Sequence, residues 1–91
     1  MEYVITFKNT NFAIRAERYL LEQKLQVGVM PLPSQIRAGC GICLRISPEE
    51  IKRALQILLS KEIAEFDLYS RVEQERGYAY SAMNDWSKIL G

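Results

Sequence analysis

Residues 42–61 read ICLRISPEEIKRALQILLSK, and the spacing of the apolar side chains changes once within this stretch. Over residues 42–46 apolar and other side chains alternate, as in a strand with one buried face. The next four residues, SPEE, combine a capping serine, a proline suited to the first helical position and a glutamate that can close a capping box. From residue 51 onward the apolar spacing is helical. The stretch therefore predicts a strand followed directly by an amphipathic helix.

The residues before this stretch predict a similar arrangement. Residues 3–7 alternate as a half-buried strand, and Asn9 and Thr10 then offer side-chain oxygens that can cap a helix. Residues 12–24 have helical apolar spacing, and residues 27–30 are typical of a second short strand. Together with residues 42–61, this half of the chain predicts the order strand, helix, strand, strand, helix.

A fourth strand is predicted over residues 64–72, where Phe66 and Leu68 alternate with Asp67 and Tyr69. The order is then β-α-β-β-α-β, which is the order of a ferredoxin-like sandwich. We therefore expect an α+β fold with a four-stranded antiparallel sheet. Both helices would cover one face of that sheet and leave the other face open.

The C-terminal residues fall outside this unit, so we expect a domain at 1–72 and an extension at 73–91. Met83, Trp86 and Leu90 have helical spacing. Ser81 could cap a short helix there. Such a short helix is unstable alone in water and needs a surface to lie on. We expect the extension to pack on the open face of the sheet or on a partner chain.

Composition excludes several classes of protein. The 91 residues carry a formal net charge of +1, which argues against nucleic acid as a partner because such proteins usually carry a basic stripe. No apolar run is long enough to span a membrane, and no signal peptide is evident at the start of the chain. We therefore expect a cytoplasmic protein without a structural disulfide.

The only two cysteines lie close together, in Gly39-Cys40-Gly41-Ile42-Cys43, and the chain has no histidine. Thiols are thus its only strongly nucleophilic groups, and no cysteine–histidine pair can form. A CxxC motif normally opens a helix whose N-terminus favours the thiolate, whereas this one opens a strand. A disulfide would also require the chain to turn at Gly41, because an extended segment holds the two Cα atoms too far apart.

Several interpretations of these thiols are open from the residue types. Two thiolates supply half of a tetrahedral metal site, so we expect neither a bound metal nor another cofactor. Cys40 can be a reactive thiol approached through Gly39 and Gly41, with Cys43 as a resolving thiol. Two further side chains, those of Arg37 and Arg45, could favour the anion. Both cysteines can equally be small buried residues without any chemical role.

The same region also resembles a known family. The residues that carry the resemblance are Pro31-Leu32-Pro33, Ile36, Cys40-Gly41 and Leu44-Arg45, after a β-α-β start. They are similar to those of the small bacterial Se/S carrier-like proteins, over roughly residues 3–69. The resemblance places the carrier cysteine of that family on Cys40, and it does not require a cysteine at Cys43.

The resemblance implies a carrier or accessory protein more than a stand-alone enzyme. Cys40 would accept sulfur or selenium as a persulfide or perselenide from a donor protein and pass it to an acceptor. The Pro/Gly-rich loop would hold the thiol out for these partners. One alternative is a homodimer or partner-binding module with structural cysteines. A weaker alternative is a dithiol redox protein that uses Cys40 and Cys43.

Overall fold

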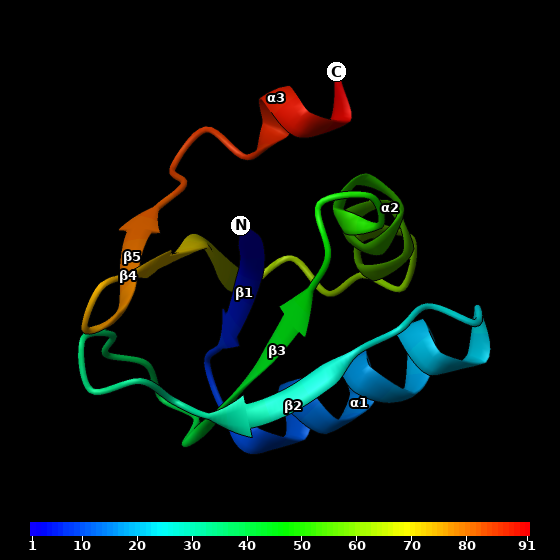
Figure 1. The fold of residues 1–91 in the computed structure, drawn as a ribbon. Coiled ribbons are helices and arrows are strands. Elements are labelled where there is room, and N and C mark those ends of the chain that lie inside the picture. Colours follow the sequence, from blue (N-terminus) through cyan, green and yellow to red (C-terminus); the bar gives the residue numbers. More distant parts are fainter.

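A computed structural model describes all residues, 1–91, as five strands and three helices (Figure 1). In chain order the elements are β1 (Glu2–Phe7), α1 (Thr10–Glu22), β2 (Gly28–Pro31), β3 (Ile42–Ile46), α2 (Ile51–Ser60), β4 (Phe66–Gln74), β5 (Gly77–Ala82) and α3 (Ser87–Leu90). The predicted α+β class and the first six elements are confirmed, with boundaries that differ by a few residues.

The strands form one antiparallel sheet in the order β2-β3-β1-β4-β5. Its first four strands have the arrangement expected of a ferredoxin-like sheet. The prediction of a four-stranded sheet is wrong, however, because residues 77–82 form a fifth strand. This strand pairs with β4 from Tyr69↔Ala82 to Gln74↔Gly77, so β4 runs past residue 72. Gly77 closes the hairpin with a φ of +129°, a conformation that favours glycine.

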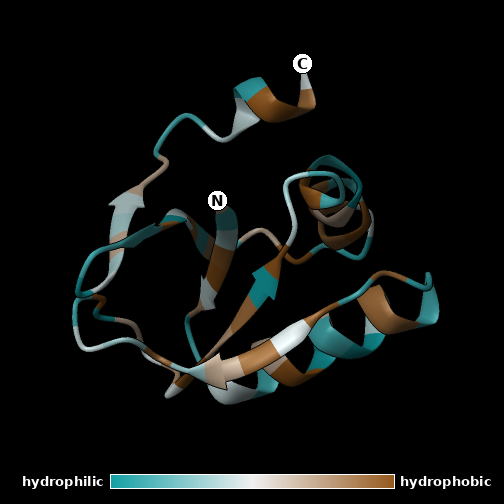
Figure 2. Cartoon of the chain, in the orientation of Figure 1, coloured by the Kyte–Doolittle hydropathy of each residue, from teal (hydrophilic) through white to brown (hydrophobic).

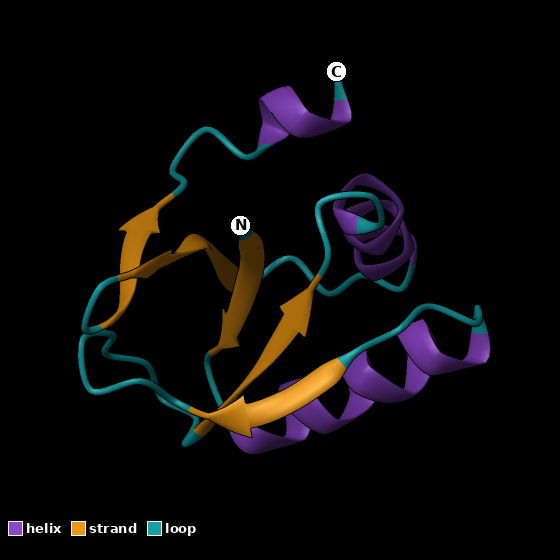
Figure 3. Cartoon of the chain, viewed as in Figure 1, coloured by secondary structure: helices purple, strands orange, loops and turns teal.

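The main core lies between the sheet and helices α1 and α2, which occupy the same side of the sheet (Figure 3). Ala13 and Ala16 are fully buried on α1, and these small side chains let the helix lie close to the strands. Both helices alternate between hydrophobic and hydrophilic bands along their length (Figure 2). The buried residues of α2, which are Ile51, Ala54, Leu55 and Leu58, have the helical spacing that the sequence predicted.

The two helix starts differ in how well their caps were predicted. Asn9 caps α1, since its side-chain oxygen accepts a hydrogen bond from Phe12 N–H at 3.0 Å. The expected capping box at α2 is wrong, because the helix begins only at Ile51 and has no side-chain cap. The Glu50 carboxylate instead accepts a hydrogen bond from Gln26 N–H at 3.1 Å. Glu50 thus binds a backbone N–H from a distant part of the chain, and not one at the start of its own helix.

The C-terminal segment packs on the main core and not on the opposite face of the sheet. Trp86 lies against Phe66 with the ring centroids 5.0 Å apart, and the short helix α3 contacts α2. Met83, Ile89 and Leu90 also pack against the core. The predicted helix is shorter than its apolar spacing indicated, and Ser81 does not cap it because Ser81 belongs to β5.

Trp86→Ala is expected to destabilise the protein by about 2 kcal/mol, because it removes a large, partly buried ring from Phe66. Urea unfolding followed by circular dichroism would measure the loss. Lys88→Ala is a matched control in the same segment, since Lys88 is exposed and makes only a surface ion pair. Equal stabilities of the two variants would mean that the segment does not pack on the core in solution.

Candidate functional site

Residues Leu32–Gly41, which we call the strap, connect β2 to β3 and carry Cys40 at their end. The ends of the strap are joined by a hydrogen bond from Leu32 N–H to the Gly41 carbonyl at 2.9 Å. Ile36 N–H donates to the Pro33 carbonyl at 3.0 Å and forms a turn within it. The strap extends away from α1 and α2 toward the β4–β5 hairpin (Figure 1). There, Gln35 Nε2 lies 3.5 Å from the Tyr78 carbonyl.

The sheet face opposite the helices is partly buried, contrary to the expectation of an open face. Val4, Thr6 and Cys43 alternate with the main-core residues of β1 and β3, and all three are buried. Ile36 of the strap is also buried, at 5% exposed, and lies outside the main core cluster. We infer that the strap covers this part of the sheet through Ile36.

Cys40 is buried in the main core, with 1% of its surface exposed. The expectation that the loop holds this thiol out to solvent is therefore wrong for this conformation. The Cys40 sulfur lies 3.7 Å from the Thr10 hydroxyl, at the first residue of α1. A helix N-terminus favours negative charge on a group beside it. The fold thus brings a helix N-terminus to a cysteine that the sequence placed before a strand.

Cys43 is completely buried, and its sulfur lies 3.8 Å from the Pro31 carbonyl of the neighbouring strand. Burial raises the pKa of this thiol from its ordinary value of 9.0 to about 11, although the positive charge of Arg71 opposes the shift. The Cys43 thiol is therefore protonated near neutral pH, which makes it a poor nucleophile.

The two cysteines are both free and lie on different sides of the sheet. Cys40 belongs to the core beneath the helices, whereas Cys43 faces the opposite side. A disulfide between them would require the chain to move, because the two side chains are buried on different sides of the sheet. The use of Cys43 as a resolving thiol stays a prediction that needs such a movement.

The burial of Cys43 predicts a specific loss of stability at alkaline pH. The unfolded chain loses the Cys43 proton near pH 9, whereas the folded chain keeps it until about pH 11. The contribution of this group to the free energy of unfolding is therefore complete below pH 9, and about 3 kcal/mol is lost as the pH rises from 9 to 11. Urea unfolding of wild type and Cys43→Ala at several pH values would show a steeper decline for wild type. Parallel declines would contradict the shifted pKa.

The two glycines beside Cys40 have different surroundings. A Cβ added to Gly39 would lie 1.9 Å from the carbonyl oxygen of Lys8, the residue after β1, so the strap can lie this close only with glycine at position 39. A Cβ added to Gly41 would meet nothing within 4 Å. Gly39 therefore has a packing role that the sequence did not reveal, while Gly41 faces open space.

The two arginines proposed from the sequence make no hydrogen bond to either sulfur. Arg37 is exposed and makes no ion pair, and Arg45 pairs with Glu2 at 3.4 Å. Glu2 also pairs with Arg71, whose guanidinium lies 3.5 Å from the centre of the Tyr78 ring. Roles for Arg37 and Arg45 at the thiol stay predictions. Sequence reasoning missed Thr10, whose proximity to Cys40 depends on a contact between distant segments.

No cluster of three or more cysteine, aspartate, glutamate or histidine residues is placed to hold a metal ion. None of the helices has the length and apolar character needed to cross a bilayer.

Comparison with known families shows to which family the chain belongs. Residues 2–70 match the model of the family described as "Putative Se/S carrier protein-like". The chain belongs to this family. The matched residues of this Se/S carrier-like protein include the strap, both cysteines and most of the sheet, but not β5 or α3. Neither the curated proteins nor the solved structures gave a match.

Proposed function

We propose that Cys40 carries sulfur or selenium as a persulfide or perselenide for transfer between partner proteins. The observation that carries the proposal is the position of the Cys40 sulfur, 3.7 Å from the Thr10 hydroxyl at the N-terminus of α1. The hydroxyl can donate a hydrogen bond to an anionic sulfur, and the helix end favours the negative charge. Family membership supports the same assignment.

The transfer is a simple exchange between sulfur atoms. The Cys40 thiolate attacks the outer sulfur of a persulfide on a donor protein, and a new sulfur–sulfur bond forms. The old bond of the donor breaks, and the donor thiolate leaves with the electron pair. An acceptor thiolate then attacks the outer sulfur on Cys40 in the same way. A perselenide donor would transfer selenium by the same step.

The burial of Cys40 requires the strap to open before a partner can reach the thiol. The strap supports this movement, because its attachments are few. They comprise the bond between its two ends, the contact of Gln35 with Tyr78, the approach of Gly39 to the Lys8 carbonyl, and the buried side chains of Ile36 and Cys40. Segments with few buried contacts open at low free-energy cost. Opening would be favoured by a partner that binds the open state more tightly than the closed one.

The proposal is tested by incubating the protein with a cysteine desulfurase and cysteine, followed by intact mass measurement. We expect a mass increase of one sulfur atom that is removed by a reducing thiol. A known sulfur carrier serves as the positive control. Absence of loading, while the control carrier is loaded, would reject the carrier function.

The interaction-module alternative receives no comparable support from the C-terminal segment. Four of its apolar side chains, those of Met83, Trp86, Ile89 and Leu90, pack against the core of the same chain. We therefore retain the carrier function as the better explanation of the strap and its thiol.

A further inference from the structure

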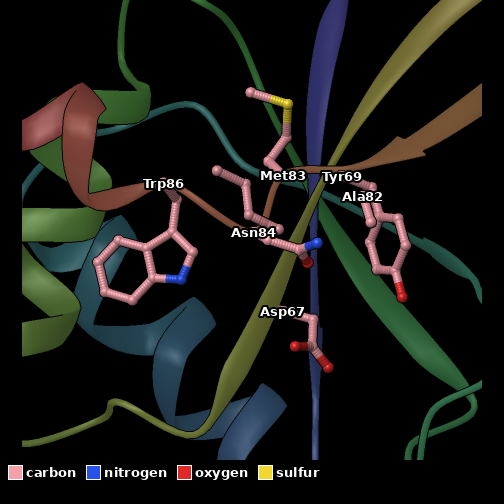
Figure 4. A pocket seen from close by; sticks show the side chains of 7 residues that line it. Asp67, Tyr69, Ala82, Met83, Asn84 and Trp86 are labelled. Carbon is pink, nitrogen blue, oxygen red and sulfur yellow. The ribbon is translucent and has the colours of Figure 1, made fainter.

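Strand β5 forms one edge of the sheet, and β2 forms the other (Figure 1). The pairing of β5 with β4 runs in register to the pair Tyr69↔Ala82, and these two residues lie close together in Figure 4. Met83 continues this pairing, since its N–H donates to the Leu68 carbonyl at 2.8 Å. The outer side of β5 has no neighbouring strand in the sheet.

The backbone of β5 presents a row of hydrogen-bonding groups to the outside. In an antiparallel pair, the positions that bond the partner strand alternate with positions that do not. Met83 bonds to β4, so the alternate positions before it face outward. These are Tyr78, Tyr80 and Ala82, whose N–H and C=O groups point away from β4. Only the Tyr78 carbonyl has a partner, the Gln35 side-chain amide at 3.5 Å.

The other edge of the sheet is protected against pairing, whereas β5 is not. Leu32 N–H bonds to the Gly41 carbonyl just beyond β2, so the same alternation makes Val29 and Pro31 the outward positions of β2. Pro31 has no N–H, which leaves Val29 as the one outward donor. Strand β5 has no proline, no bulge and no charged side chain, which are the usual devices that prevent pairing at an edge.

We propose that β5 pairs with β5 of a second copy of this chain, antiparallel and centred on Tyr80. Tyr80 would then lie opposite its own copy across a two-fold axis, and Tyr78 of each chain would lie opposite Ala82 of the other. Centring the pair on Tyr80 uses every outward position of the strand, and about six backbone hydrogen bonds would form. Such a self-paired surface is the usual interface of a two-fold dimer. The proposal does not rest on the carrier function of Cys40.

The side chains of β5 favour a second copy as the occupant of this edge. In the proposed register the large ring of Tyr78 lies beside the small side chain of Ala82, and on the other face Ala79 lies beside Ser81. The two Tyr80 rings form the one pair of large side chains, and aromatic pairs across strands are stabilising. Like charges do not meet, because β5 carries none. A charged partner strand would find no opposite charge on β5.

The paired edge is short, so the dimer should be weak. The 6 residues of β5 in each copy bury less than the roughly 1,200 Å² of a standard interface. We expect a dissociation constant of about 0.1 mM. Sedimentation of the wild-type protein should therefore change from monomer to dimer between about 10 μM and about 1 mM. A monomer at every concentration in this range would overturn the proposal.

Ala82→Pro and Val29→Pro provide a matched comparison, because each removes one outward N–H from an edge strand and no hydrogen bond of the sheet. Ala82→Pro should weaken the dimer by at least about tenfold, since its N–H is used twice across the two-fold axis. Val29→Pro should dimerise like wild type. Dimerisation of Ala82→Pro at the wild-type level would overturn the proposal, as would a loss confined to Val29→Pro.

Amide hydrogen exchange of the wild-type protein gives a test that does not depend on the folding of the proline variants. The amides of Tyr80 and Ala82 should exchange at least about threefold more slowly at about 1 mM than at about 10 μM, because the dimer protects them. The amide of Val29, which faces outward on the other edge, should exchange at the same rate throughout. Rates independent of concentration, or a slowing confined to Val29, would overturn the proposal.

Discussion

The Cys40→Ser protein is expected to acquire no sulfur from a persulfide donor, whereas the Cys43→Ser protein should be loaded like wild type. The reason is the different position of the two thiols. The Cys40 sulfur lies 3.7 Å from the Thr10 hydroxyl at the N-terminus of α1, and this hydroxyl can donate a hydrogen bond to a carried sulfur anion. Burial raises the pKa of Cys43 to about 11, so this thiol stays protonated at neutral pH. Intact mass after incubation with a cysteine desulfurase and cysteine gives the result directly.

These two variants also separate the carrier function from the redox alternative. A dithiol mechanism would need both cysteines. Loss of sulfur loading in Cys43→Ser would therefore favour that mechanism over a single carrier thiol. Loading of Cys40→Ser at the level of wild type would assign the sulfur to another residue and contradict the proposal. Each variant should first be shown to be folded by circular dichroism, because both cysteines are buried.

Gly39→Ala is expected to destabilise the closed strap by about 3 kcal/mol and to expose the Cys40 thiol. The added Cβ would lie 1.9 Å from the Lys8 carbonyl oxygen, and a backbone atom cannot rotate away as a flexible side chain would. The strap must therefore move from β1, and Cys40 is the next residue along it. Urea unfolding would report the stability, and the rate of modification by iodoacetamide would report the exposure of the thiol.

Gly41→Ala is the matched control for this substitution. It places the same methyl group on the other side of Cys40, where nothing lies within 4 Å. Its stability should stay within about 0.5 kcal/mol of wild type, and its thiol should react at the wild-type rate. If Gly39→Ala also behaved like wild type, the strap would not be packed against β1 in solution as described. Faster sulfur loading of Gly39→Ala would further indicate that strap opening limits the transfer.

The elements of the fold could be predicted wherever the pattern was local. The alternation over residues 42–46 and the helical spacing after residue 50 correctly identified β3 and α2, since both depend on which side chains face the core. Strand β5 was missed because its residues resemble a tail with aromatic side chains. Its status as a strand depends on the free edge of β4, which no local pattern reveals.

The candidate site was predicted only in part for the same reason. The alternation over residues 42–46 predicts that Cys43 faces away from Ile42 and Leu44, and in the structure Cys43 indeed lies outside the main core cluster that contains Cys40. The sequence could not reveal that Cys40 would be buried or that it would lie beside Thr10, 30 residues away along the chain. The ion pair between Arg45 and Glu2 was also not predicted, because Glu2 lies on another strand.

For this protein, the sequence by itself shows that the two cysteines are the only strong nucleophiles. It also determined the order of the first six elements and the side of the sheet that each residue of β3 faces. These features follow from residue type and from the fixed periods of strands and helices. Only the tertiary structure decided that Cys40 is buried in the main core beside the start of α1 and that both thiols are closed off from solvent. Such contacts join segments distant in the chain, and they form because the strap and the sheet bury apolar surface together.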